Sequence, residues 1–255
     1  MADAELVLLC WSDYVGLTRC RGVPASELAG RMQDGLGWAV AGQALTPFAD
    51  IAPNPWGPMK EVRQVPVPET RTRVDLWDGV PAFHFYLCDS RNEDGSRWEC
   101  CTRGFMQAAL DDFARETGLD FVAAFEHEFT LLGESLPQAP PFSLEAMRQA
   151  AAFTGDVSAA LKLAGVDPET VEPEYGYNQY EVTTAPAVGA MAGDRAIITR
   201  EVSARPRAGA DTEPPSAPSQ ASTASATGPT CTSASATQTV AMRRTTRTAS
   251  QGPAS

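Results

Sequence analysis

The chain has 255 residues, a net charge of −12, only two histidines and six cysteines. An acidic chain lacks the basic surface that nucleic acids and anionic membranes require, and two histidines exclude a histidine-rich metal site. The sequence has no apolar stretch of membrane-spanning length, no basic signal-peptide segment at its start and no C-x-x-C spacing, so we expect a cytoplasmic protein with reduced thiols.

Residues 1–100 are predicted to form a small, mainly β domain. Residues 5–24 fit a strand, a turn and a second strand, and residues 25–37 fit a short helical turn that Ser26 caps. Residues 47–60 carry four prolines, which predicts a loop. The other expected elements are strands at residues 61–67, 72–78 and 82–89 and a turn at residues 92–96.

Helices alternate with strands after residue 100, which predicts an incomplete α/β domain over residues 101–203. Residues 105–118 have apolar side chains at helical spacing, with Gly118 at the C-cap. Residues 143–166 are predicted to form two helices that are split near Thr154 and Gly155. The remaining elements are a strand at 121–133, a strand–turn–strand at 171–186 and a helix at 191–202.

The end of the chain differs sharply in composition. Residues 204–255 contain no Leu, Ile, Phe, Trp or Tyr and are rich in Ala, Ser, Thr, Pro and Arg. Such a segment cannot bury enough apolar surface to offset its ordering entropy, so we predict a disordered tail over these residues.

The first candidate functional pair lies in the strand over residues 121–132. Alternation along this strand places Glu126 and Glu128 on one face and His127 on the apolar face, where it is expected to be a packed core residue. Two neighbouring carboxylates are costly unless a cation lies between them, and Mg²⁺ prefers such hard oxygen ligands. The alternative is a solvated strand face.

The second pair is Glu174 and Glu181, which flank a predicted turn. Gly176 and Asn178 can adopt the positive φ of a tight turn, which would bring both carboxylates onto one side. The alternative is an ordinary polar hairpin. Together the two pairs predict a four-carboxylate metal site.

Seven segments, in order along residues 5–203, resemble the glutamine synthetase family. They are WSDYVGLTRCRGVP, GLGWAVAGQALTPF, EVRQVPVPETRTRV, YLCDSRNEDGSRWECCTRG, FEHEFTLL, EYGYNQYEV and APAVGAMAGDRAIITREV. FEHEFTLL is similar to the family's E-x-E metal strand, and EYGYNQYEV to its E-x-G-P-G-Q-Y-E segment. The resemblance implies an α+β fold, with a β-grasp-like N-terminal domain followed by an incomplete α/β catalytic domain.

The same resemblance implies a ligase activity. In this family ATP phosphorylates the γ-carboxylate of glutamate, and ammonia or an amine displaces the phosphate. The cofactor would be Mg²⁺ (or Mn²⁺), and the substrates ATP, glutamate and ammonia or an amine. By position, one metal would be held by Glu128, Glu174 and Glu181, and Glu126 would help to hold another. The resemblance also implies a homo-oligomeric ring with active sites between neighbouring subunits.

The sequence departs from the family pattern at two places. Tyr177 and Asn178 replace the usual Pro-Gly before Gln179, and Asn178 tolerates the left-handed conformation that this turn needs. Glu172 stands where a histidine is common. These departures leave open which amine is used.

The tail departs further, because the family's later motifs do not occur in it as written. In a shifted frame, the codons of residues 225–237 permit Gly-Asn-Gly-Ala-His-Val-His-Leu-Ser-Leu-Arg-Asp, and those of residues 213–220 permit Ala-Thr-Phe-Ser-Pro-Val-Pro. Both resemble family motifs in the expected order. This predicts a frameshift between about Ser203 and Asp211; the alternative is a natural disordered tail.

Three functions follow as alternatives. The first is an ATP-dependent ligase that forms a γ-glutamyl amide from glutamate and ammonia, truncated in this chain. The second is a γ-glutamyl ligase for an organic amine. The third is an inactive fragment that only binds a metal or joins a ring of intact subunits.

Overall fold

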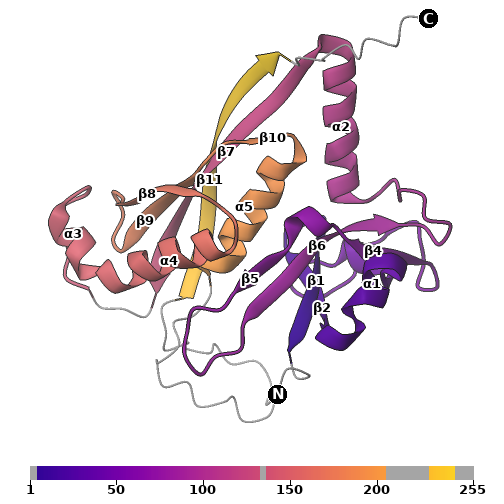
Figure 1. The fold of residues 1–255 in the computed structure, drawn as a ribbon, viewed down its shortest axis with the longest axis horizontal. Coiled ribbons are helices and arrows are strands. Elements are labelled where there is room, and N and C mark those ends of the chain that lie inside the picture. The colour runs from indigo at the N-terminus through magenta and orange to yellow at the C-terminus, as the bar shows by residue number, and fades with distance from the viewer. Residues whose placement is uncertain (1–4, 133–135, 205–229, 245–255) are drawn as a thin grey trace, which may run out of the picture.

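The computed structural model describes residues 5–132, 136–204 and 230–244. These residues form two β-sheets, one from each half of the chain, with helices beside them (Figure 1). The largest core cluster draws buried side chains from both sheets, including Phe85 and Leu87 from the first half and Phe129 and Val182 from the second. The fold is α+β, as predicted. The described part of the chain contains no helix with the length and hydrophobicity of a membrane span.

The first sheet has the strand order β2-β1-β6-β4-β3, with β5 paired to β6. Its first strand, β1, lies between β2 and β6, antiparallel to β2 and parallel to β6. Helix α1 packs Leu28 and Met32 against Val7 and Leu9 on one face, which gives the expected β-grasp-like arrangement. The strands are β1 (Leu6–Ser12), β2 (Thr18–Pro24), β3 (Leu36–Ala39), β4 (Glu61–Pro66), β5 (Thr72–Val74) and β6 (Phe83–Arg91).

Two details of this half differ from prediction. Ser26 does not cap a helix: it lies inside the 3-10 helix η2 (Ala25–Glu27), and α1 (Leu28–Asp34) begins after Glu27 without a side-chain cap. The prediction failed because η2 precedes α1 and displaces its start. The expected strand at residues 72–78 ends at Val74, and residues 77–80 form a bend and a turn.

The second sheet has the order β10-β7-β9-β8, and β11 pairs with the other edge of β7. All of its pairings are antiparallel. Side chains of α4 and α5, including Phe153, Leu161 and Ile198, pack against one face. The elements are β7 (Leu119–Leu132), α3 (Leu144–Gln149), α4 (Ala151–Leu163), β8 (Pro168–Pro173), β9 (Gln179–Thr184), β10 (Ala187–Val188), α5 (Ala190–Ser203) and β11 (Thr230–Arg244).

The break between the two helices of residues 143–166 is at Ala150, not near Thr154 and Gly155. Gly155 lies inside α4, and a Cβ there would meet no neighbour, so this glycine serves no turn. Ala150 instead has φ −96° and ψ 9°, which ends α3 and starts α4 in one residue. A glycine in an exposed helix interior weakens the helix without ending it, which explains the wrong prediction.

The part of the predicted tail that the structure describes, residues 230–244, forms strand β11. Strand β11 pairs with β7 from Thr230↔Leu132 to Arg244↔Leu119, with one register shift between Thr232 and Ser235. Strand pairing uses backbone groups and favours β-branched residues, so an edge such as that of β7 can recruit a segment too poor in apolar residues to form a core. The rest of the predicted tail, residues 205–229 and 245–255, lies outside the described residues.

Helix α2 (Thr102–Thr117) confirms the predicted helix and its glycine C-cap. Gly118 has φ 68°, in the left-handed region that other residues avoid. Gly118→Ala is expected to lower the free energy of unfolding by about 1 kcal/mol, because Ala is strained at positive φ.

The matched control is Gly30→Ala in α1, where the backbone is helical and a Cβ would meet nothing within 4 Å. It should raise stability by about 0.5–1 kcal/mol. Urea unfolding of both variants measures the two changes in the free energy of unfolding. If both changes have the same sign, the explanation from backbone conformation is contradicted.

Candidate metal centre

Three strands of the second sheet place acidic side chains in one row. Glu128 of β7 lies opposite Glu181 of β9, and Glu181 lies opposite Glu172 of β8. Residues directly opposite each other in a sheet share a face, and residues two apart on a strand do as well. Glu126 and Glu174 therefore extend the same acidic face. The helices pack on the opposite face, where Phe129, Tyr180 and Val182 are buried.

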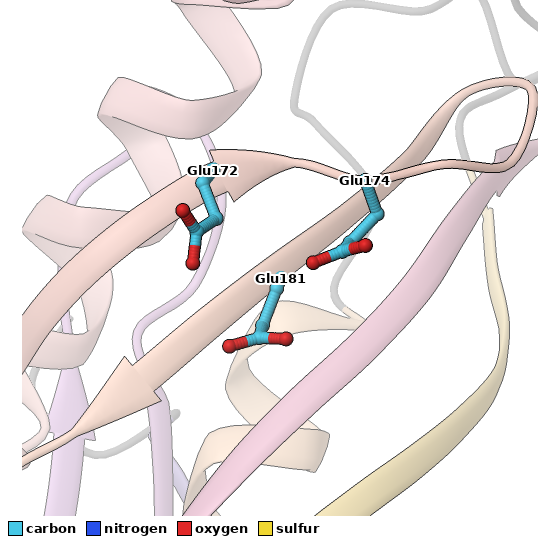
Figure 2. Close-up of side chains that lie close together, drawn as sticks. All are labelled: Glu172, Glu174 and Glu181. Carbon is cyan, nitrogen blue, oxygen red and sulfur yellow. The ribbon is translucent and has the colours of Figure 1, made fainter. Parts of the chain in front are cut away.

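Three of these carboxylates converge. One oxygen from each of Glu172, Glu174 and Glu181 lies within 4.8 Å of the others. Figure 2 shows the three side chains close together, with Glu172 on β8, Glu174 in the turn that follows it and Glu181 on β9. Glu181 is 9% exposed, and the other two are half-buried. Hard oxygen ligands at this spacing fit a divalent cation such as Mg²⁺ or Mn²⁺.

The turn between β8 and β9 brings Glu174 and Glu181 together across their seven-residue separation. Asn178 has φ 54°, which confirms that it adopts the left-handed conformation. Gly176 does not have positive φ, so that part of the prediction is wrong. Its missing Cβ matters for space, because a Cβ there would collide with the Gln179 side chain. Glu174 N donates to Gln179 O at 2.8 Å and closes the turn.

Gln179 is a further residue of the candidate site that was not among the predicted site residues. Its Nε2 donates to Glu128 Oε2 at 2.6 Å, and its Oε1 accepts from Gly176 N at 2.8 Å. The side chain therefore links the turn to the carboxylate of β7 and fixes that carboxylate's orientation. Its place in the segment EYGYNQYEV, two residues before Glu181, was the available signal.

The acidic face carries a large electrostatic cost. Desolvation is the main cause that raises the pKa of Glu181 to about 7, and four neighbouring carboxylates add to it. These are Glu126, Glu174, Glu172 and Glu128. A bound cation would offset the repulsion between these carboxylates, so the acidic face fits a cation better than it fits solvent alone.

His127 lies on the other face of β7, as expected of a packed histidine. It is 4% exposed, and burial lowers its pKa, so the ring is neutral near pH 7. It therefore belongs to the core between β7 and α5 rather than to the acidic face.

The structure thus groups the predicted residues differently from the sequence. Glu174 and Glu181 come together as expected, but the third member of the close group is Glu172, which was not among the candidate ligands. Glu126 and Glu128 lie on the neighbouring strand, close enough to Glu181 to affect its charge.

Two family models match the chain. Residues 1–98 match the "Glutamine synthetase N-terminal domain", and residues 99–208 match the "Glutamine synthetase, catalytic domain". A curated relative is gamma-glutamylpolyamine synthetase GlnA3 of Streptomyces coelicolor. It is 23% identical over 209 residues, which are 76% of this chain and 43% of the relative.

Solved structures with a similar fold include three that cover more than three quarters of this chain. A "novel glutamine synthase homolog" has TM-score 0.75 and 40% identity, with 78% of this chain and 48% of that chain covered. The apo form of GmaS has TM-score 0.66 at 20% identity, with 78% and 47% covered. Glutamine synthetase of Plasmodium falciparum has TM-score 0.58 at 11% identity, with 79% and 45% covered. The chain therefore spans about half the length of the relatives it matches.

Proposed function

The chain belongs to the glutamine synthetase family, and from that premise we propose that it carries the first part of an ATP-dependent ligase that joins the γ-carboxylate of glutamate to ammonia or an amine. The observation that carries the proposal is the acidic face of β7, β8 and β9, where Glu128 lies opposite Glu181 in the sheet and carboxylate oxygens of Glu174 and Glu181 lie within 4.8 Å of each other. This activity belongs to the complete ligase, and this chain spans about half the length of the relatives it matches.

The residues of this face have distinct roles in the proposal. Glu174 and Glu181 hold a divalent cation together with Glu128, and Glu126 contributes to a second. When bound, the cation supplies positive charge to the phosphoryl group in transfer. Gln179 keeps the Glu128 carboxylate aimed across the sheet through its 2.6 Å hydrogen bond.

The test is formation of γ-glutamyl hydroxamate from glutamate, ATP and hydroxylamine. We expect the product from a chain whose gene reads through residues 204–255 in the shifted frame, and at most a trace from the chain as written. Sequencing the gene and transcript across codons 195–240 decides which chain the cell makes. A full-length product without ATP-dependent hydroxamate formation would reject the ligase.

Glu172 favours an organic amine as the second candidate acceptor. It adds one more negative charge to a face that already holds four carboxylates, and surplus charge attracts a cationic amine over neutral ammonia. The similarity to a gamma-glutamylpolyamine synthetase supports the same acceptor class.

Glu172→Gln is expected to lower the preference for a diamine over hydroxylamine by about tenfold, the loss of one charge-assisted hydrogen bond. ATP consumption by the chain that is read through in the shifted frame, measured with each amine, gives this ratio. The control is Glu169→Gln, which removes an exposed carboxylate from the same strand. A ratio that both variants leave unchanged would point to ammonia.

An assembly role is the third candidate. Phe48 and Met59 in the proline-rich loop are 88% and 89% exposed, and apolar side chains this exposed favour a protein interface. In the proposed ring, this loop contacts a second subunit. The test is co-purification of this chain with full-length subunits, which the double variant Phe48→Ser, Met59→Ser should lose. If the wild-type chain stays monomeric when mixed with full-length subunits, the assembly role is rejected.

A further inference from the structure

A cysteine pair lies in the β1–β2 hairpin, apart from the acidic face. Cys10 of β1 is directly opposite Cys20 of β2 in the antiparallel register. Residues opposite each other share one face of the sheet, so the two thiols project to the same side. Cys10 is 5% exposed within the core cluster that joins the two sheets, whereas Cys20 is exposed.

The hydrogen-bond pattern of the hairpin gives this pair its spacing. Asp13 N donates to Leu17 O at 3.1 Å, so the pair next to the turn is a hydrogen-bonded one. Hydrogen-bonded and non-hydrogen-bonded pairs alternate along an antiparallel ladder, which places Cys10 and Cys20 at a non-hydrogen-bonded position. At such positions the Cα atoms are about 4.5 Å apart, within the range that a disulfide spans.

The two thiols also differ in reactivity. They share a hydrogen bond, which lowers the pKa of Cys20 to about 6. The same hydrogen bond, then burial, raises the pKa of Cys10. Other charged or ionisable groups facing the pair are Glu201 of α5 and Cys88 of β6, and both oppose ionisation of Cys10. An exposed thiolate beside a buried, protonated thiol is the arrangement of an attacking and a resolving cysteine.

We propose that Cys10 and Cys20 form a peroxide-sensitive thiol pair that closes to an intramolecular disulfide. The Cys20 thiolate attacks one oxygen of hydrogen peroxide, the O–O bond breaks, and hydroxide leaves to give a sulfenic acid. Cys10 then loses its proton as its sulfur attacks Cys20, and the S–O bond breaks to release water. Overall, two thiols are oxidised to a disulfide, and one peroxide is reduced to two waters.

The pair lies where the hairpin contacts the catalytic half of the chain. Thr18, two residues before Cys20, donates its hydroxyl to Glu201 Oε1 at 2.7 Å and accepts from Arg200 Nη2 at 2.8 Å. Oxidation of Cys20 removes a negative charge that faces Glu201, and the new bond stiffens the strand that carries Thr18. The modification therefore acts on the contact between β2 and α5.

In the test, the reduced 255-residue chain is exposed to hydrogen peroxide. The remaining thiols are then blocked with N-ethylmaleimide, and the peptides are mapped by mass spectrometry. We expect a Cys10–Cys20 disulfide in the wild-type chain, formed before any other cysteine is oxidised. Cys10→Ala should leave a sulfenic acid at Cys20 that dimedone traps, and should slow alkylation of Cys20 at pH 7 by about tenfold.

Cys100→Ser is the matched control, because Cys100 is partly exposed and lies outside the hairpin; it should change neither result. Two findings on the wild-type chain would overturn the proposal, and neither depends on a variant's folding. One is a disulfide from Cys20 to any other cysteine or to a second chain. The other is a pair that stays reduced while other cysteines are oxidised.

Discussion

Replacing Arg103 by methionine is expected to lower the free energy of unfolding by about 3–5 kcal/mol. Arg103 stands at the start of α2 and donates Nε and Nη2 to the two carboxylate oxygens of Asp194 on α5, each at 2.9 Å. Its Nη1 reaches Asp89 of β6 at 2.7 Å. The side chain of Asp194 is 2% exposed, so Arg103→Met leaves a buried charge without its partner.

Urea unfolding measures this effect, and two further variants identify its cause. Arg115→Met removes an exposed arginine of the same helix, paired with Asp112, and should cost under about 0.5 kcal/mol. Arg103→Met combined with Asp194→Leu should recover most of the loss, because it removes both charges of the buried pair. A loss below about 1 kcal/mol for Arg103→Met alone would show that solvent already reaches the Asp194 carboxylate.

Glu181→Gln is expected to stabilise the metal-free chain at pH 8 by about 2–3 kcal/mol while it abolishes stabilisation by Mg²⁺ or Mn²⁺. Desolvation, with neighbouring carboxylates, raises the folded-state pKa of Glu181 from its ordinary 4.5 to about 7. A raised folded pKa gives stability that is present below about pH 4.5 and lost as the pH rises through 7. With a chelator present to remove metal ions, the wild-type chain should therefore lose stability as the pH rises from about 4.5 to 7, and the Glu181→Gln variant should lose less.

Metal addition then separates a binding role from a structural one. At about one hundred times its Kd, a cation should stabilise the wild-type chain by about 2.7 kcal/mol at pH 8 and should fail to stabilise Glu181→Gln. Its affinity should fall below pH 7, as protons compete for the Glu181 carboxylate. Glu169→Gln is the matched control on β8 and should respond to metal like the wild type. Equal stabilisation of both variants would show that the cation binds elsewhere.

The elements that short-range signals specify were predicted from the sequence. Helix α2 has apolar residues at helical spacing and a glycine at its C-cap, and β7 alternates between its two faces from Phe125 to Leu131. Both signals lie within one element, so no information on distant contacts was needed.

The features that were not predicted depend on how separate strands pair with one another. Glu172 joins the carboxylate group because the register of β8 on β9 places it opposite Glu181, and that register follows from the turn at residues 174–178. Strand β11 depends on an open edge of β7 rather than on its own composition. A single segment cannot specify such a property, since cross-strand register belongs to the pair.

The position of β1 has a consequence for the chain during its synthesis. This strand pairs with β2 through a short turn, but its other neighbour, β6, ends only at Arg91. At about 5–20 residues per second, several seconds separate the synthesis of the hairpin from that of its partner strand. An isolated two-stranded hairpin is marginally stable, so we expect the nascent chain to hold Cys10 and Cys20 in a fluctuating, solvent-accessible ribbon until β6 arrives. Cys10, which is buried in the folded chain, should therefore be accessible to thiol reagents in the ribosome-bound chain until β6 is made.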